Sequence, residues 1–272
     1  MTRLRYLKLC EIDYNSTTGY SFTNLWTLTQ LRGLSLSSIV LTQNHVETGL
    51  SKLTNLEELD IYASYTHNES WFVDYTELLN LRRLTNLSVM DVKLNTKLAN
   101  IIATMTQLIQ LDFFELDGRY ELGIYSNLTN LTRIWFGLDI CYEDYGLAFH
   151  RMPKLEFVSI PWCQNVTQLV KLPKLRQLFL RKGNESEFNH LNFLKELTTL
   201  EELTISGDVL PFQGYVDLQG LTALQQIGLF MTSQSLNNKS SNALKRKLRS
   251  YYSKFVFIAK KKLSKIIFIL LD

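Results

Sequence analysis

Residues 53–61 read LTNLEELDI, and variants of this stretch recur along the chain, such as LTQLRGLSL at residues 28–36. Leu59 and Ile61 are two residues apart, so on a β-strand their side chains point to the same side. Asp60 lies between them and points to the other side. Each copy therefore predicts a short strand with one apolar side.

Ten copies share the pattern L-x-x-L-x-x-L-x-L, whose nine positions we number from 1 to 9. The copies begin at residues 1, 28, 53, 84, 105, 128, 152, 172, 197 and 221. Consecutive starts therefore recur at a fairly even period, as in proteins built from stacked repeats. One unit of this length cannot bury its apolar side chains alone, but stacked units bury them in a continuous core. The repeats therefore predict a solenoid in which the strands form a parallel sheet.

This pattern and its spacing resemble the leucine-rich-repeat family, whose repeats are typically about 20–29 residues long. The form LTNLxxLxL is similar to the short repeats of internalins, and the resemblance covers about residues 1–232. It implies an α/β fold: a horseshoe solenoid with a parallel sheet on the concave face and mixed helices and turns on the convex face. The family usually places Asn or Cys three residues after the last apolar position, and only Asn95 and Cys163 match here. The turns must therefore satisfy their backbone groups in other ways.

The segments between the motifs are mixed in character. Residues 68–84 and 95–105 have the composition of helices, with a cap residue and acidic side chains early in the first of them. Residues 207–221 contain Pro and Gly, which favour a looser turn. The longest helix is thus expected where the spacing is widest, between the copies that begin at positions 53 and 84.

The charge is unevenly distributed along the chain. The whole chain has 29 Lys/Arg and 26 Asp/Glu, and residues 239–272 hold ten of the basic residues and one acidic residue, which leaves 19 and 25 elsewhere. We therefore divide the chain into a leucine-rich-repeat domain, residues 1–232, and a basic non-repeat tail, residues 233–272. Residues 242–272 carry no motif, so they are expected to add no eleventh repeat and to form a separate helix or remain disordered.

The tail allows four interpretations. An amphipathic helix could lie on an anionic membrane, or the lysines could bind the phosphates of a nucleic acid. A helix could instead cap the last repeat, or the tail could be translated AT-rich non-coding sequence. The last two are favoured, so no nucleic-acid partner is expected and membrane contact through the tail is a weaker alternative. No stretch reaches the roughly 18 uninterrupted apolar residues of a membrane span.

Motifs for catalysis or cofactor binding are missing from the sequence. It contains no GxGxxG, no phosphate-binding GxxxxGK[ST], no HExxH, no CxxC and no GxSxG. No enzyme activity, cofactor or metal is therefore expected. Three cysteines form no evident disulfide framework, which favours a reducing, cytoplasmic location.

The most informative residues are those at motif position 8, which face solvent on the strands. In this alignment Asp60, Asp91 and Asp112 form one ladder on neighbouring strands about 4.8 Å apart, and Trp135 and Phe179 follow in the same row. Exposed aromatics anchor protein interfaces, and acidic strips select basic partners. The predicted partner-binding residues are Glu58, Asp60, Tyr62, Asp91, Asp112, Phe114, Trp135, Phe157, Trp162 and Phe179.

These features predict a non-catalytic scaffold that binds a protein partner, one with a basic surface, on the strand face. A first alternative is the sensing or recognition segment of a larger receptor or signalling protein, because the chain starts inside a motif with no cap before it. A second alternative is a peripheral membrane protein held by the basic tail.

Overall fold

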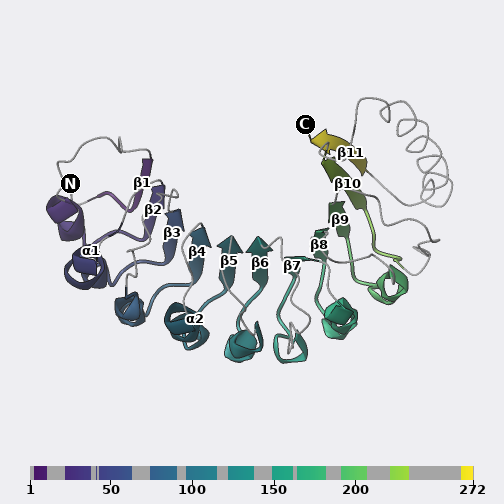
Figure 1. Ribbon diagram of the computed structural model, residues 1–272, viewed down its shortest axis with the longest axis horizontal. Coiled ribbons are helices and arrows are strands. Elements are labelled where there is room, and N and C mark those ends of the chain that lie inside the picture. The colour runs from purple at the N-terminus through teal and green to yellow at the C-terminus, as the bar shows by residue number, and fades with distance from the viewer. Residues whose placement is uncertain are drawn as a thin grey trace. The chain divides into compact units, whose positions relative to one another are not determined.

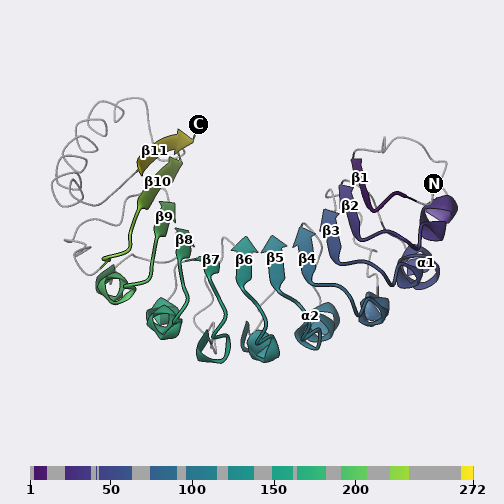
Figure 2. The ribbon, with the colours of Figure 1, turned by 180° about the vertical axis from the view of Figure 1, so that it is seen from behind.

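The structure is a computed structural model in which the chain forms two compact units. One unit contains residues 1–138 and 146–154, and the other contains residues 139–145 and 155–272. Within each unit a parallel sheet forms one side and short helices form the other (Figures 1 and 2). The described residues are 3–10, 22–37, 41, 43–62, 74–90, 96–114, 122–137, 149–161, 164–181, 191–206, 221–232 and 265–271.

The first unit has six strands in chain order, with every neighbouring pair parallel. The strands are β1 (Tyr6–Cys10), β2 (Gly33–Ser37), β3 (Glu58–Tyr62), β4 (Asn86–Met90), β5 (Gln110–Phe114) and β6 (Arg133–Gly137). Two short α-helices and five 3-10 helices connect them within the described residues. These are η1 (Phe22–Thr27), α1 (Gln43–Thr48), η2 (Leu50–Lys52), η3 (Thr76–Asn80), α2 (Thr96–Ala103), η4 (Leu122–Asn127) and η5 (Phe149–Arg151).

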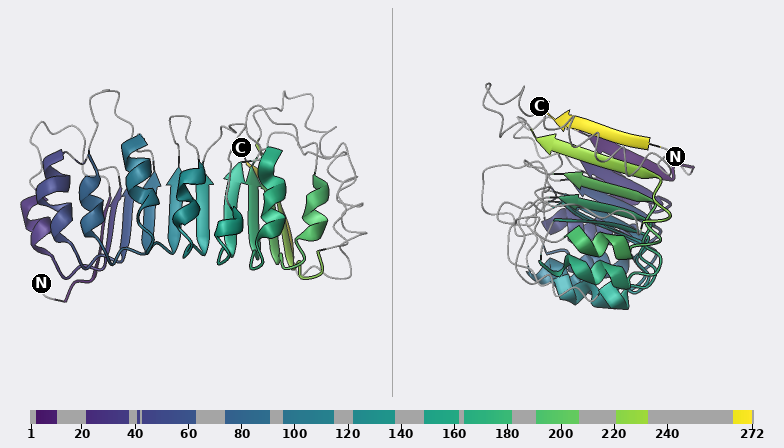
Figure 3. Two further views of the ribbon diagram at one scale, coloured as in Figure 1. Left: turned by 90° about the horizontal axis from the view of Figure 1, so that it is seen from below. Right: turned by 90° about the vertical axis from the view of Figure 1, so that its right-hand side faces the viewer.

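The second unit repeats this arrangement with five strands, again parallel and in chain order (Figure 3). The strands are β7 (Phe157–Pro161), β8 (Gln177–Arg181), β9 (Glu202–Ser206), β10 (Gln226–Thr232) and β11 (Lys265–Leu271). The described connections include η6 (Gln164–Lys171) and η7 (Leu191–Glu196).

The apolar motif positions form the core, as predicted. In β3, Leu59 is fully buried and Ile61 nearly so, whereas Asp60 is exposed. Complete burial of a leucine side chain stabilises a fold by about 1.5–3 kcal/mol, so the stacked apolar positions stabilise the repeat array. Where position 9 is a phenylalanine, Phe113 and Phe136 stack with ring centroids 5.8 Å apart and Tyr125 packs beside them.

Departures from the expected burial occur both at apolar positions and at position 8. In the first copy Leu4 is 36% exposed, and Leu7 and Leu9 are only partly buried. β1 has a neighbouring strand on one side only within the described residues, so fewer side chains cover its leucines. The opposite departure occurs in β7, where Ser159 at position 8 was expected to be exposed and is fully buried.

The predicted alignment of the fourth copy is wrong by three residues. Leu87 of β4 pairs with Leu59 of β3, so the motif begins at Leu81 and not at residue 84. Leucines three residues apart fit the pattern in both registers, which is why the motif alone could not distinguish them. The corrected start shortens the spacing before this copy and lengthens the spacing after it. Both spacings then lie within the family range of about 20–29 residues.

The corrected start of the fourth copy also agrees with the helix that precedes it. Only η3 is described within residues 68–84, and it ends at Asn80, directly before the first leucine of the motif. Residues 68–73 lie outside the described residues, as do residues 207–220 of the turn predicted at 207–221. The helix predicted at residues 95–105 is confirmed as α2.

The prediction that the tail adds no further strand is also wrong. Residues 265–271 form β11, which pairs in parallel with β10 over seven residues. The segment reads KIIFILL, and β-branched and aromatic residues favour strands. The outer edge of β10 offers unpaired backbone groups that such a segment satisfies. Residues 233–264 of the tail lie outside the described residues.

The turns between helix and strand satisfy their backbone groups through side chains at motif position 3. Asn55 donates from Nδ2 to the Thr29 carbonyl of the preceding repeat (2.9 Å), and Asn130 donates to the Thr106 carbonyl in the same way (3.0 Å). Gln107 donates to the Leu81 carbonyl at 3.5 Å. We call the side of the sheet formed by motif positions 1 to 5 the turn edge. These bonds lie before the strands, whereas the turn positions that hold Asn or Cys in the family come after the strands and mostly lie outside the described residues.

Candidate functional site

Three rows of side chains cover the solvent side of the first unit's sheet. They occupy the residue before the first strand leucine, motif position 8, and the residue after the motif, which we call the leading, middle and trailing rows. Of the predicted site residues on β3, Glu58 is in the leading row, Asp60 in the middle row and Tyr62 in the trailing row. All three are exposed, and Tyr62 is 39% exposed.

The predicted ladder of three aspartates is not formed. Asp60 faces Ser88 and Ser88 faces Asp112, so a serine stands between the two aspartates. The two carboxylates are thus two strands apart, about 9.6 Å at ordinary strand spacing. Asp91 lies outside the described residues. The displacement follows from the three-residue register error in this copy.

Arg133 neutralises one of the two aspartates. Its Nε donates to both carboxylate oxygens of Asp112, at 3.3 and 3.4 Å. The two side chains are only 27% and 21% exposed, so the pair is largely removed from solvent. Burial raises the pKa of Asp112 despite the nearby Arg133 guanidinium, and the charge of Asp60 raises it further.

Asp60 has weaker side-chain contacts than Asp112 has. Burial raises its pKa above the ordinary value, and a hydrogen bond with Ser35 and the charge of Lys8 act in the opposite direction. Carboxylates that are partly desolvated attract cations more strongly than carboxylates in bulk water. Glu58 adds a second negative charge on β3, so the acidic character of this face is centred on that strand.

Trp135 is part of the same assembly as Asp112 and Arg133. Asp112 and Trp135 face each other across β5 and β6, and the Arg133 guanidinium lies 5.1 Å from the centroid of the Trp135 ring. This distance is within the range of cation–π attraction. Trp135 is half-buried, so its indole presents one part to solvent while Arg133 fixes its position. Phe114 lies in the trailing row of β5, and nothing about its side chain is described.

The remaining aromatic candidates lie on the second unit. Phe157 is in the leading row of β7 and Phe179 in the middle row of β8, and both are half-buried. Ser159 pairs in register with Phe179, and its Oγ is buried and has no hydrogen-bond partner among the described residues. This part of the face, around Ser159 and Phe179, is therefore more closed to solvent than predicted. Trp162 lies outside the described residues.

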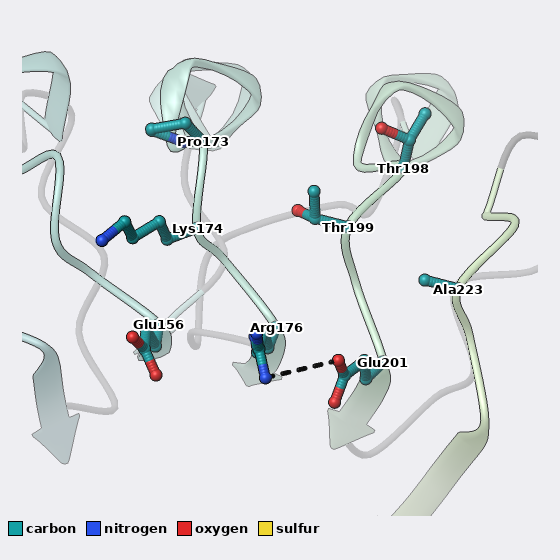
Figure 4. A pocket seen from close by; sticks show the side chains of 8 residues that line it. All are labelled: Glu156, Pro173, Lys174, Arg176, Thr198, Thr199, Glu201 and Ala223. Carbon is teal, nitrogen blue, oxygen red and sulfur yellow. Dashed lines mark ion pairs between the residues drawn. The ribbon is translucent and has the colours of Figure 1, made fainter.

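A groove of about 440 Å³ lies on the turn edge of the second unit. Figure 4 shows its walls, which come from the turns that lead into β7 to β10. Arg176 and Glu201 form an ion pair of 3.7 Å across it. The groove is lined by Glu156, Pro173, Lys174, Arg176, Thr198, Thr199, Glu201 and Ala223.

Sequence reasoning missed Arg133 and the groove. Arg133 is two residues before Trp135, and residues i and i+2 share a side of a strand. Alternation alone could therefore have indicated that the Arg133 and Trp135 side chains lie side by side. The groove has a weaker sequence signal: position 3 changes from Asn, Gln or Arg in early copies to Thr199 and Ala223 in the last two. Such a change is visible only after the turn edge has been recognised.

Metal clusters and membrane-spanning helices are not found in the described part of the chain. No group of three or more His, Cys, Asp or Glu residues there could hold a metal ion. No helix there is long and apolar enough to cross a membrane.

No protein-family model matches the sequence, and no curated protein is detectably similar to it. Solved structures do match. An internalin (InlF) of Listeria monocytogenes has a TM-score of 0.52 at 18% identity, over 83% of this chain and 61% of its own. Internalin C2 of the same species has a TM-score of 0.45 at 19% identity, over 72% and 79% of the two chains. The plant peptide hormone receptor RGFR1, in complex with RGF2, has a TM-score of 0.43 at 16% identity, over 75% and 33%.

The likeness to the internalin InlF shows the fold. Together with the parallel repeat sheet, it identifies a leucine-rich-repeat solenoid. The chain spans about 61% of the internalin's length.

Proposed function

We propose that this leucine-rich-repeat chain is a non-catalytic binding protein that holds a protein partner on the strand face of its first unit. The observation that carries the proposal is the assembly of Asp112, Arg133 and Trp135 on β5 and β6. Tryptophan and arginine are enriched among the residues that dominate binding energy at interfaces. A sheet fixes their spacing, so little conformational entropy remains to be lost on binding.

The charge of this face supports a partner with a basic surface. Glu58 and Asp60 are exposed on β3 and have no arginine partner like that of Asp112 among the described interactions. Tyr62 stands beside them as a further exposed ring. A partner lysine or arginine placed near Asp60 would meet a carboxylate that is already partly desolvated.

A second candidate is the recognition segment of a larger protein. It is supported by the comparison in which this chain covers 61% of an internalin's length. Both candidates use the same strand face, so one binding experiment serves both. A cytoplasmic, reducing location is part of the first proposal and is consistent with the free, exposed Cys10.

The test begins with affinity capture of the partner, followed by measurement of its association and dissociation rates. Trp135→Ala should weaken binding by about thirtyfold, as expected for loss of an anchor worth roughly 2 kcal/mol. Leu79→Ala is the matched control, because Leu79 is 45% exposed on η3 and therefore on the helix side. It should bind normally.

The acidic residues should act mainly on the association rate. The double variant Asp60→Asn, Asp112→Asn should slow association several-fold, and the effect should shrink as salt screens the charges. If both strand-face variants bind like the native protein while Leu79→Ala does not, the helix side carries the contact and the proposal is wrong.

A further inference from the structure

The groove lies on the second unit's turn edge, where the position-3 side chains differ from those of the first unit. In the first unit, Asn55 and Asn130 at position 3 each reach back and donate to a carbonyl of the preceding repeat. The next position-3 residues extend the ladder: Arg83 donates to Asn55 Oδ1 at 3.1 Å and Lys154 donates to Asn130 Oδ1 at 2.6 Å. These side chains cover part of the turn edge, and Asn55 and Asn130 each satisfy one of its backbone carbonyls.

In the second unit the same position holds Lys174, Thr199 and Ala223. Thr199 is too short to reach the turn as asparagine does, and it donates to the Leu175 carbonyl at 2.8 Å instead. The Ala223 side chain has no hydrogen-bond donor. The carbonyls of Pro173 and Thr198 occupy the places of the accepting Thr29 and Thr106 carbonyls, and no donor reaches them within the described ranges.

Two of the four charged side chains that line the groove form an ion pair with each other. Arg176 and Glu201 pair with each other, at 3.7 Å. Lys174 and Glu156 also line the groove, and neither has an ion pair in the part of the chain that the structure describes. In Figure 4 the Lys174 side chain extends toward the segment that leads into Glu156, so the two unpaired charges lie toward the same end of the groove.

We propose that this groove binds an extended peptide segment of a partner protein, one that carries an acidic and a basic side chain. Its backbone amides would donate to the Pro173 and Thr198 carbonyls in place of the missing position-3 side chains. Its acidic group would pair with Lys174 and its basic group with Glu156. Recognition of an extended peptide through its main-chain groups, with side chains giving specificity, is a general mode of peptide binding. The volume of about 440 Å³ lies within the usual range of ligand sites, roughly 300–1,000 Å³.

The experiment is a titration of the full, isotope-labelled chain followed by amide chemical shifts. The probe is a pool of N-acetylated, C-amidated hexapeptides with Asp and Lys fixed at two positions and the other positions randomised. A second pool has Asn and Gln at those two positions, and inorganic phosphate is the third probe. The charged pool should shift the amides of Lys174, Thr199 and Ala223 at least five times more than the neutral pool.

Three variants sharpen the result. Lys174→Gln and Glu156→Gln should each weaken binding of the charged pool at least fivefold, whereas Lys171→Gln, which changes an exposed lysine at the end of η6, should not. Ala223→Asn restores the ladder, so it should fill the groove, abolish binding and leave the melting temperature unchanged or higher. Trp135→Ala should bind the pool normally, which separates this site from the strand face.

Three outcomes would overturn the proposal. One is the absence of shifts at the groove with the charged pool. Another is equal binding by the native chain and Ala223→Asn. The third is an equal response to inorganic phosphate, which would reduce the groove to a simple anion site.

Discussion

Residues 53–62 and residues 81–90 are neighbouring repeats with the same apolar pattern and different surfaces. Both place a leucine, Leu59 or Leu87, at the first buried position of the strand, and both leucines are essentially inaccessible. Their middle-row residues differ, since Asp60 is exposed and Ser88 is 9% exposed. The burial of the apolar positions is therefore determined by the repeat itself. The exposure of its surface positions depends on the neighbouring repeats.

The comparison also shows how a repeat can be misaligned. Residues 81–92 contain apolar residues that satisfy the motif from either Leu81 or Leu84. The second choice would place Met90 in the core and Asp91 in the middle row. The register between β3 and β4 selects the first choice, which places Ser88 between Asp60 and Asp112 and leaves Met90 half-buried.

Core truncations give the largest expected effect and test this register directly. Leu59→Ala and Leu87→Ala should each lower the free energy of unfolding by about 2–5 kcal/mol, because both create a cavity among buried leucines. Met90→Ala should cost less than about 1 kcal/mol, as at other partly exposed positions. Chemical denaturation of the three variants measures these values. A large loss for Met90→Ala together with a small loss for Leu87→Ala would restore the other alignment.

Ser88→Asp would build the aspartate ladder that the sequence predicted. We expect it to destabilise the protein at pH 7 by about 1–3 kcal/mol, because it buries a charge between Asp60 and Asp112. Ser88→Asn has nearly the same shape without the charge and is the control. Near pH 3 the three carboxyls become largely protonated, so the two variants should converge. Equal stability of both variants at pH 7 would show that the three positions are not adjacent.

The side-chain hydrogen bonds of the turn edge should contribute less to the free energy of unfolding than the buried leucines do. Asn55→Ala removes the hydrogen bond to the Thr29 carbonyl and the acceptor of Arg83, so it should cost about 0.5–1.5 kcal/mol. Arg83→Ala removes only the exposed side-chain contact and should cost less than about 0.5 kcal/mol. Thermal unfolding of both variants at equal concentration gives the comparison. The reverse order would mean that the ladder contributes nothing through its backbone contacts.

Asp60→Asn should have the smallest effect, and it should be stabilising. Because burial raises the pKa of Asp60 in the folded state, the ionised carboxylate destabilises the fold at any pH above that value. Stability should therefore fall as pH rises from about 4 through the folded pKa. The side chain is exposed, so solvent screening limits the gain at pH 7 to less than about 0.5 kcal/mol. Unfolding curves at pH 7 and pH 3 should show a gain only at pH 7, and a loss at pH 7 would contradict the assignment.

Much of the fold could be predicted from residues alone. Leu59 and Ile61 alternate with Asp60, so the buried and exposed sides of β3 followed from strand geometry. The tail was mispredicted because KIIFILL contains no motif, and its pairing depends on the free edge of β10. The solvent row was predicted correctly at Asp60, Asp112 and Trp135, whereas Ser159 is buried by neighbours that a single repeat does not specify.

The sequence by itself determined the repeating unit, because the spacing of its apolar residues permits one kind of strand and one kind of stack. Only the tertiary structure decided which surface residues meet. Asp112 and Arg133 are 21 residues apart, and Asn55 and Thr29 are 26 apart, yet each pair is joined by a hydrogen bond between neighbouring repeats. Burial requires only a leucine at the apolar position, whichever repeat supplies its neighbours. A hydrogen bond requires two particular atoms within about 3 Å, and whether they meet depends on the register of whole strands.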